Sequence, residues 1–382
     1  MELFLGILLG LFVLVVLVVL HELGHAIVAQ RNGVVVEEFG IGFPPRAWSR
    51  KLKNGVLFTL NWLPLGGFVK LKGEHDSAKG EGTYGQASFW VKTKILLAGV
   101  LINWFTAALL FSVIALVGLP KILPNQVVLP FDNTVSTTPV EIRAVSKDSP
   151  AERAGLQVGD IVTYIDDVKI TTVDEMRQMT AEKAGDIVPV QYVRDDEPHI
   201  VKVQLRSGDE AATSGYLGVG SSQSSTIRAT WSAPILGIAT AGQLTHETLS
   251  GLGSIIVKGL AGFFGQFSGN EDTREQAHAN LAEVGNSVSG PIGILGVIFP
   301  SVVDAGITQI LLLVAIISLT LAVMNILPIP ALDGGRWFTM AAFRLLKKDL
   351  TKEREETIQA IGFLALIVLM ILVTWSDVGK LF

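Results

Sequence analysis

Two histidines and a glutamate follow an apolar run that is long enough to cross a membrane. Every residue from Leu3 to Leu20 is apolar or glycine, and His21, Glu22 and His25 come directly after it. On an α-helix, positions i and i+4 share a face, so both imidazoles can bind one metal ion. The spacing H-E-x-x-H is typical of zinc protease chemistry, in which the glutamate acts on the water that the metal activates.

The apolar span could also end at Leu20 and leave the histidines at the membrane surface. We favour a site within the helix, because residues 24–28 continue a mostly apolar segment. An acid inside a span costs about 2.5–3.5 kcal/mol on insertion scales, so such residues are functional as a rule.

A third zinc ligand must come from elsewhere, because catalytic zinc uses three protein ligands and one open position. Residues 324–336 read MNILPIPALDGGR, in which Pro328 and Pro330 interrupt an apolar span. Non-helical backbone at membrane depth is tolerated only inside protein or around a wet cavity. Asp333 is the only acid in this segment and is the predicted third ligand. The alternative is a turn or helix cap, since Asp-Gly is a common turn pair.

The composition indicates a membrane protein. Of 382 residues, 49% are hydrophobic and 17% charged, and the mean hydropathy is +0.48. The net charge of −5 argues against a nucleic-acid partner. The chain has no cysteine, so any metal must use histidine, aspartate or glutamate.

Four segments predict transmembrane helices, since about 20 apolar residues cross a bilayer. They are Leu3 to about Val28, Ile95–Leu119, Ile307–Pro330 and Ile358–Trp375. Ten Lys and Arg residues lie in 29–94 and six in 331–357, against thirteen spread over 120–306. The positive-inside rule therefore predicts that the two basic loops are cytoplasmic and that both termini and the long loop are extracytoplasmic.

Residues 34–75 predict a small β-structure between the first two spans. Asn54-Gly55 between two apolar runs is a strong hairpin signal. From the pattern alone, a loop that dips into the membrane and a plain cytoplasmic hairpin are equally favoured. The run Leu57–Asn61 is the candidate edge strand for an unwound substrate, which makes Thr59 and Leu60 candidate substrate-binding residues.

The long loop predicts two further regions. Strand-like runs occupy 138–207, and SPAERAGLQVGDIVTYIDDVKI at Ser149–Ile170 resembles a PDZ domain, which binds peptides by adding a strand. Residues 208–228 are rich in serine and glycine and predict a linker. The stretches Ala229–Thr245 and Leu249–Phe267 predict two helices on or near the outer membrane surface. If both instead spanned the membrane, the sidedness of the later loops would be unchanged, so that alternative stays open.

Taken together, HELGH, NILPIPALDGG and the intervening PDZ-like region resemble the site-2 protease family of intramembrane zinc metalloproteases, closest to its bacterial RseP-like (regulator of sigma factor protease) branch. The resemblance implies one Zn²⁺ per chain, bound by His21, His25 and Asp333, with Glu22 as base and acid. It implies that Asn325, Pro328 and Pro330 hold substrate near the zinc, and that 34–72 form a membrane re-entrant β-loop. Asn103 and Gly290-Pro291-Ile292-Gly293 also resemble family elements.

The expected fold is a polytopic α-helical membrane protein with about four transmembrane helices, a membrane-associated β-loop and an extracytoplasmic β-rich PDZ domain. The expected segments are 1–33, 34–75, 93–119, 138–207, 229–300, 307–336 and 357–377.

The expected function is that of an intramembrane zinc endopeptidase of regulated intramembrane proteolysis. It would cleave single-span, previously trimmed proteins such as anti-sigma factors and signal peptide remnants. The expected location is a bacterial inner membrane, with the active site toward the cytoplasm and a peptide or carboxyl terminus at the PDZ groove. The alternative is a proteolytically inactive PDZ membrane scaffold.

Overall fold

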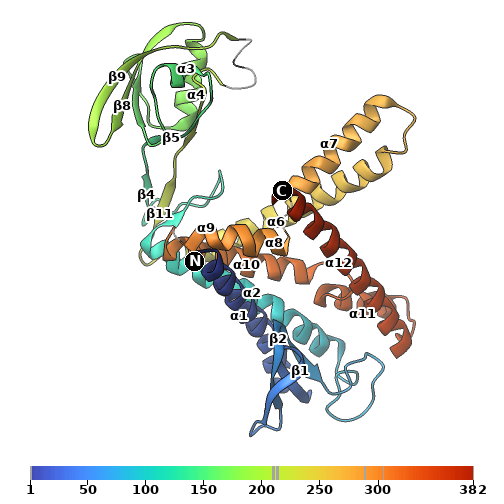
Figure 1. The fold of residues 1–382 in the computed structure, drawn as a ribbon. Helices are drawn as coiled ribbons and strands as arrows, with labels where there is room; N and C mark the ends of the chain where they lie inside the picture. Colours follow the sequence, from blue (N-terminus) through green and yellow to red (C-terminus); the bar gives the residue numbers. More distant parts are fainter. Residues whose placement is uncertain (1, 209–210, 212–214, 288–289, 304, 382) are drawn as a thin grey trace. The chain divides into compact units, whose positions relative to one another are not determined.

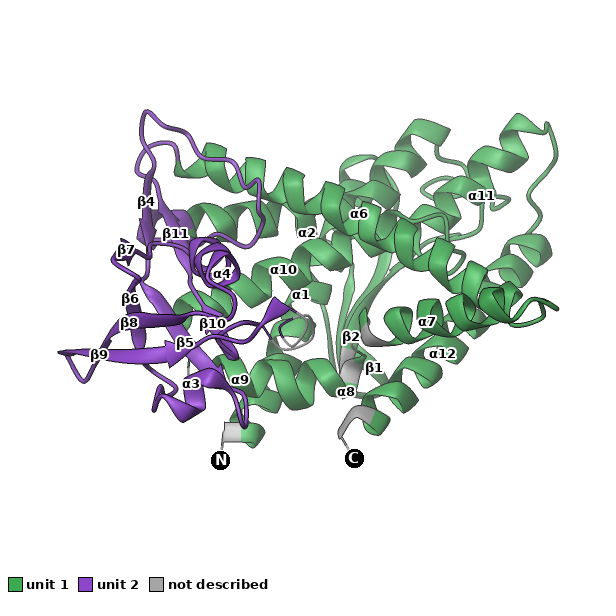
Figure 2. Cartoon of the chain, turned by 90° about the horizontal axis from the view of Figure 1, so that it is seen from above, with its two compact units in different colours: residues 1–114, 233–382 green, residues 115–232 purple. Residues whose placement is uncertain are grey.

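The computed structural model describes residues 2–208, 211, 215–287, 290–303 and 305–381. The chain forms two compact units, one of residues 1–114 and 233–382 and the other of residues 115–232 (Figure 2). Each unit is described by itself below.

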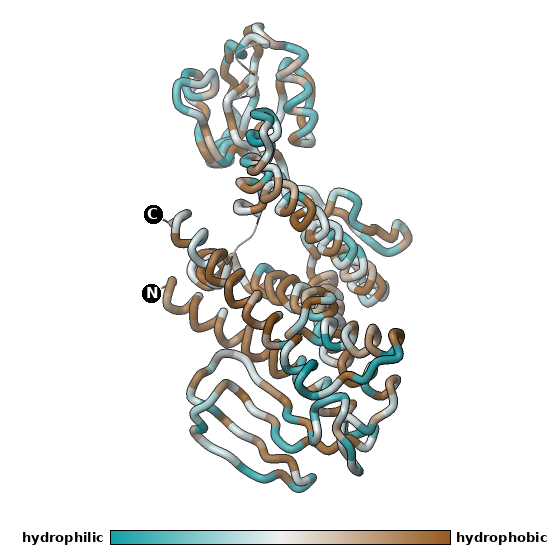
Figure 3. The backbone as a smooth tube through the Cα atoms, turned by 90° about the vertical axis from the view of Figure 1, so that its right-hand side faces the viewer, coloured by the Kyte–Doolittle hydropathy of each residue, from teal (hydrophilic) through white to brown (hydrophobic). Residues whose placement is uncertain are grey.

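Among the described residues, five helices of the chain are long and apolar enough to cross a membrane, and their apolar colouring is visible in Figure 3. They are α1 (Glu2–Arg31), α2 (Phe89–Val117), α6 (Ala233–Gly265), α10 (Ile307–Ile326) and α12 (Lys352–Leu381). Four of them correspond to the predicted spans. The fifth, α6, covers both stretches that were predicted as separate surface helices. That prediction of two helices was wrong. Only His246, Glu247 and Thr248 separate the two stretches, and with no glycine or proline among them the helix continues through these polar residues.

Small residues let the helices of the first unit approach closely. A methyl group at Gly24 of α1 would lie 2.7 Å from the carbonyl oxygen of Ala98 in α2. Near the other end of α1, Gly6 and Gly10 lie against a short helical segment, which comprises α8 (Pro291–Gly293), the π-helix η1 (Ile294–Ile298) and α9 (Phe299–Val303). Phe299 is fully buried there with Leu17 of α1. These glycines thus bring α2 and the α8–η1–α9 segment into close contact with α1, and Figure 1 shows α9 beside the start of α1.

Helix α6 turns back into α7 (Glu271–Ser287), and the two pack side by side. Gly262 of α6 lies against Ala277 and Leu281 of α7. At its start, α6 packs on the end of α2, where a methyl group at Gly237 would collide with Ser112. Helices α6 and α7 thus form a helical hairpin.

The segment after α1 is a β-hairpin, as predicted from Asn54-Gly55. Strands β1 (Val36–Lys51) and β2 (Leu57–Leu71) pair antiparallel, Gly55 has φ +88°, and the Val56 N–H donates to the Asn54 side chain over 3.3 Å. Both strands bend, β1 near Gly42 (φ +76°) and β2 near Gly66 (φ +97°), so they form four paired segments.

These bends correct the predicted edge strand. Residues 38–41 lie opposite 57–60 and also opposite 67–70, while 57–61 lie opposite 46–51 as well. The run Leu57–Asn61, with Thr59 and Leu60, is therefore an inner segment, and the edges are 46–51 and 67–71. The sequence-based prediction treated each apolar run as one straight strand, so it did not anticipate that each strand bends and contributes two paired segments.

The second unit contains two sheets. The larger has six strands: β5 (Val140–Val145), β6 (Ile161–Ile165), β7 (Val168–Lys169), β8 (Ile187–Arg194), β9 (Glu197–Gln204) and β10 (Val219–Ser222). Their order is β10-β5-β6-β8-β9, with β7 beside β6. The helices α3 (Pro150–Arg153) and α4 (Val173–Glu182) complete this region. The smaller sheet is formed by β3 (Leu119–Pro120), β11 (Ser225–Arg228) and β4 (Thr134–Thr137), in that order.

The strands and the helix that were predicted between 138 and 207 are present. The boundary toward the predicted linker differs, because β10 pairs with β5 and Leu217 belongs to the same hydrophobic core. Residues 209–210 and 212–214 of that linker lie outside the described residues. Strand β10 is short and rich in serine and glycine, so its pairing depends on β5 and gives little signal in sequence.

Candidate metal centre and active site

His21, His25 and Asp333 meet at one point of the first unit. His21 and His25 lie one turn apart on α1, and Asp333 is the first residue of α11 (Asp333–Leu345). The Oδ2 atom of Asp333 is 3.0 Å from Nε2 of His21 and 3.2 Å from Nε2 of His25, and the two Nε2 atoms are 3.1 Å apart. Both histidines are buried. The structure thus brings together the three residues that were predicted as ligands from opposite ends of the chain.

The geometry suits zinc. Ligand distances of about 2.0–2.1 Å in a tetrahedral site place donor atoms about 3.3 Å apart. The three observed distances, 3.0 to 3.2 Å, are close to this value. Within the described residues, these three side chains are the one group that could hold a metal ion. A methyl group at Gly99 of α2 would lie 2.5 Å from Nε2 of His25, so α2 leaves room at this point for the metal-binding nitrogens.

His25 is oriented by the backbone of α2. Its Nδ1 atom lies 2.7 Å from the carbonyl oxygen of Ile95. A carbonyl only accepts hydrogen bonds, so Nδ1 carries the proton and Nε2 keeps its lone pair for a metal. Such second partners commonly fix the ring of a metal-binding histidine. Sequence reasoning missed Ile95 because a backbone carbonyl has no residue signature.

Asp333 reaches the site because the chain stops being helical after Ile326. Leu327 is extended, and Ala331 has φ +78°, a conformation that L-residues rarely adopt. The Ala331 N–H donates to the side chain of Gln359 on α12 over 2.6 Å. A methyl group at Gly362 would lie 2.4 Å from Pro330, so α12 packs tightly against this loop. Helix α12 therefore holds the loop that presents the third ligand.

Glu22 faces a small cavity beside the three ligands. The cavity, of about 110 Å³, is lined by Glu22, His25 and Asp333, and also by Val69 of β2. Residues 67–70 pair with 38–41 on one side only, so Val69 lies in an edge segment of the sheet. A methyl group at Gly67 in the same segment would lie 3.8 Å from the Glu22 side chain, so this edge lies beside the site. The glutamate is thus placed for proton transfer next to the metal site.

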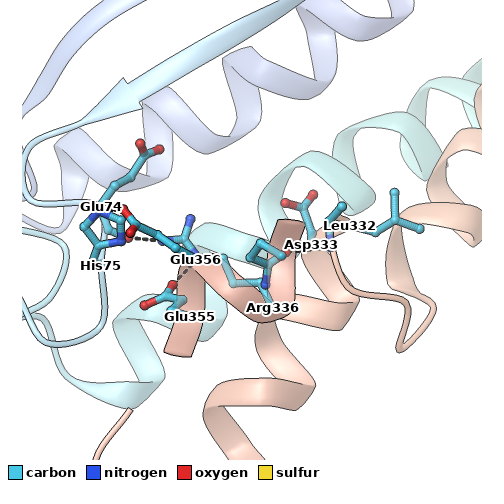
Figure 4. A pocket seen from close by; sticks show the side chains of 9 residues that line it. Glu74, His75, Leu332, Asp333, Arg336, Glu355 and Glu356 are labelled. Carbon is cyan, nitrogen blue, oxygen red and sulfur yellow. Dashed lines mark hydrogen bonds and ion pairs between the residues drawn. The ribbon is translucent and has the colours of Figure 1, made fainter. Parts of the chain in front are cut away.

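A second, polar pocket adjoins the cavity. It has a volume of about 310 Å³, and Glu74, Asp333 and Arg336 line both spaces. Figure 4 shows Arg336 between Asp333 and the carboxylates of α12. Arg336 donates from Nε to Glu355 over 3.1 Å and also to the backbone carbonyl of Glu74. Burial raises the pKa of Glu74 above its usual range, although Arg336 opposes this shift.

The predicted substrate-binding residues have varied surroundings. Asn325 donates from its amide to the carbonyl of Leu321 over 3.0 Å, within α10. Pro328 is exposed, whereas Pro330 packs on α12. Thr59 is fully buried and donates to Glu38 over 2.9 Å, and Leu60 is exposed on an inner segment of the sheet.

The sequence element Gly290-Pro291-Ile292-Gly293 has a partner that the sequence did not reveal. The carboxylate of Asp377 in α12 accepts the N–H of Gly290 over 3.1 Å and that of Gly293 over 2.8 Å. Asp377 is buried, and side chains at either glycine would crowd it. The predicted fourth span ended at Trp375, two residues before this aspartate.

The site has a glutamate beside two helical histidines and one carboxylate, and it lies among helices of membrane length. These features are typical of a metal-dependent peptidase that is an integral membrane protein. Comparison with known proteins agrees. The model of the peptidase family M50 matches residues 9–369, and the chain belongs to this family. It is a zinc metalloprotease.

Two relatives match almost end to end. The chain is 29% identical to a putative zinc metalloprotease of Clostridium perfringens, with 95% of each chain covered. It is 27% identical to the zinc metalloprotease RasP of Shouchella clausii, with 96% of this chain and 97% of the relative covered. Among solved structures, the chain matches the PDZ domain of an SdrC-like protein from Listeria monocytogenes at 23% identity. The match covers 25% of this chain and 93% of the solved chain, and its TM-score of 0.20 is too low to assign the fold.

Proposed function

We propose that this zinc metalloprotease cleaves membrane-spanning segments of other proteins inside the bilayer, with one zinc ion held by His21, His25 and Asp333. The observation that carries the proposal is the burial of this cluster between apolar helices, with a free sheet edge beside Glu22. A substrate helix that enters such a site meets ligands, base and strand edge together.

Bound zinc would polarise the scissile carbonyl and activate a water molecule for attack. Glu22 takes the proton of the attacking water and passes it to the leaving amine. The small cavity and the polar pocket share Glu74, Asp333 and Arg336 in their linings, and water would reach the zinc through this polar region and not between the apolar helices.

The substrate must be unwound before cleavage, because a helix keeps its carbonyls in hydrogen bonds. Each backbone group left unpaired in lipid costs several kcal/mol. The edge segment 67–71 offers replacement bonds by strand addition, which reads no sequence. The rim of the same sheet carries exposed Phe43, Trp48, Trp62 and Leu63, which suits insertion into the membrane interface.

The packing of the first unit supports the proposed sidedness. Gly237 packs on the end of α2, and Pro300 packs on Gly6 near the start of α1. Helices α1 and α2 run antiparallel, since His21 faces Asn103 and His25 faces Ile95. Both contacts therefore lie at the membrane side opposite the zinc site. The α6–α7 hairpin therefore returns the chain to the side from which it came. The basic loops 29–94 and 331–357 then share the cytoplasmic side, and the termini are extracytoplasmic.

The second unit is proposed to be an extracytoplasmic PDZ domain within 140–222 that filters substrates by size or binds a freshly exposed carboxyl terminus. The proposed substrates are single-span proteins that another protease has already trimmed, such as anti-sigma factors and signal peptide remnants. The proposed location is the bacterial cell membrane, in keeping with bacterial relatives. An inactive scaffold is disfavoured, since it would not need an assembled ligand set.

The test compares two variants of the purified protein on a single-span substrate. Glu22→Gln keeps the side-chain shape but cannot take a proton, so cleavage should be lost while zinc stays bound. Asp333→Ala should lose both cleavage and zinc. Metal analysis and product detection read the two properties separately. Undiminished cleavage by the Glu22 variant, or full zinc in an active Asp333 variant, would refute the assigned roles.

A further inference from the structure

The two histidines differ in what faces their second nitrogen. His25 donates from Nδ1 to a backbone carbonyl, whereas Nδ1 of His21 faces the side-chain amide of Asn103 on α2 at 3.5 Å. Asn103 is 1% exposed, and its Oδ1 atom is buried without a hydrogen-bond partner among the described residues. A buried, unpaired amide oxygen beside a metal-ligand histidine needs an explanation.

The orientation of the amide supplies one. Nε2 of His21 points at Asp333 and at His25, so Nδ1 must carry the proton if Nε2 is to bind metal. An N–H facing the NH₂ group of Asn103 would set two donors against each other. The oxygen and nitrogen of an asparagine amide are distinguished only by their hydrogen bonds, and a half-turn exchanges them. The half-turn brings Oδ1 to His21, removes the clash between two donors, and places the NH₂ group where Oδ1 had no partner.

We propose that Asn103 accepts the Nδ1–H of His21 through Oδ1 and thereby fixes the imidazole with Nε2 toward the zinc. Asn103 is a positioning residue, because it acts on the metal through His21. The inference rests on the proposed function, since it assumes that His21 binds zinc.

With Asn103 in this role, three residues on one face of α2 contact the two histidines. Ile95, Gly99 and Asn103 are spaced by four, so they lie in one row on α2. Ile95 orients His25, Gly99 leaves space for both Nε2 atoms, and Asn103 orients His21. The row is fixed at its far end by Ser318 of α10, whose hydroxyl donates to the backbone carbonyl of Asn103 over 2.8 Å.

Removal of the acceptor should weaken zinc binding. A buried Nδ1–H without a partner is unfavourable, so the ring would move its proton to Nε2, where it competes with the metal. Loss of such a second partner commonly reduces metal affinity or activity by about 10–100-fold.

The experiment measures the zinc dissociation constant of the full-length protein in detergent, by competition with a chelator. Asn103→Leu keeps the size and removes the acceptor, and should bind zinc about 10–100-fold more weakly. Asn103→Asp keeps an acceptor at the same place and should stay within a few-fold of the unsubstituted protein. The matched control is Ser318→Ala, which removes the other hydrogen bond of Asn103 but leaves its side chain facing His21, and should retain the affinity.

The visible absorption of the cobalt-substituted protein gives a second readout. Its bands should shift or broaden in Asn103→Leu and remain unchanged in Ser318→Ala. Wild-type zinc affinity in Asn103→Leu would overturn the inference. So would an Asn103→Asp protein that is folded, as judged by thermal unfolding, yet as weak as the leucine variant.

Failure of the proposed function looks different. If His21→Ala bound zinc as well as the unsubstituted protein, the ligand set itself would be wrong, whatever the asparagine variants did.

Discussion

Asp160 illustrates how the atoms facing a single residue decide its properties. Its carboxylate accepts from Nε of Arg194 over 2.7 Å and from the Gln157 N–H over 2.8 Å. Burial by itself would raise the pKa of Asp160, but the bonds from Arg194 and from the Gln157 backbone outweigh it, so the pKa is lowered. The native state therefore favours the ionised form more strongly than the unfolded chain does.

This shift predicts how the second unit responds to acid. A lowered native pKa gives stability that is complete above the unfolded value, about 3.9, and is lost as the pH falls through the native value. We expect the protection of amides within 140–222, relative to the exchange rate of an unfolded chain at the same pH, to fall below about pH 4 in the unsubstituted protein. Asp160→Asn should be less stable at neutral pH and should show a weaker dependence. Equal pH dependence in both proteins would contradict the prediction.

Among the elements, the sheet edge at 67–71 has the most direct role in the proposal. Val69 lies in this edge segment and lines the cavity beside Glu22. Proline removes a backbone donor and is tolerated in sheets essentially at edges. Val69→Pro should therefore fold and bind zinc, but turn over a stable transmembrane substrate at least about tenfold more slowly. Thr59→Pro, on an inner buried segment, should unfold the sheet instead.

Two substrates separate the possible causes of a slower Val69→Pro enzyme. A substrate with helix-weakening glycine or proline near the cut needs less help to unwind, so it should lose less turnover. An equal loss for both substrates would mean that the substitution acts through Glu22 and not through strand addition.

A second contact between elements involves Asp377 of α12. It ties α12 to the start of the α8–η1–α9 segment through two backbone N–H groups. Asp377→Ala leaves these groups without a charged acceptor and should destabilise the protein by about 2 kcal/mol, measured by thermal unfolding in detergent. Asp377→Asn, which keeps an acceptor oxygen, is the matched control and should lose less. Equal stability of all three proteins would show that water replaces the carboxylate.

For the whole molecule, the predicted zinc site and the proposed substrate filter lie in different units. All predicted zinc ligands lie in the first unit, and the six-stranded sheet lies in the second. Deletion of 140–222, with a short flexible replacement, should leave the zinc content unchanged. Substrates with bulky extracytoplasmic domains should then be cut faster, and short ones about equally. Loss of zinc, or an unchanged size preference, would count against a filter.

The sequence by itself determined the parts of this protein that depend on local pattern. The apolar runs predicted α1, α2, α10 and α12, because length and hydropathy decide membrane spans. The i, i+4 spacing placed His21 and His25 on one face, and the prolines after α10 drew attention to Asp333, the predicted third ligand, which lies beside the two histidines. Asn54-Gly55 marked the hairpin because few other residues adopt its turn.

Tertiary structure alone decided the partners that have no residue signature. The carbonyl of Ile95 belongs to the backbone, which any residue type can supply, and the sequence did not show that Gly99 would face the two histidines. The edge of the sheet depended on where β1 and β2 bend, and the pairing of Asp377 with a glycine turn joins residues more than 80 positions apart. Such contacts are set by packing between segments that are distant in the chain, and local sequence patterns do not indicate them.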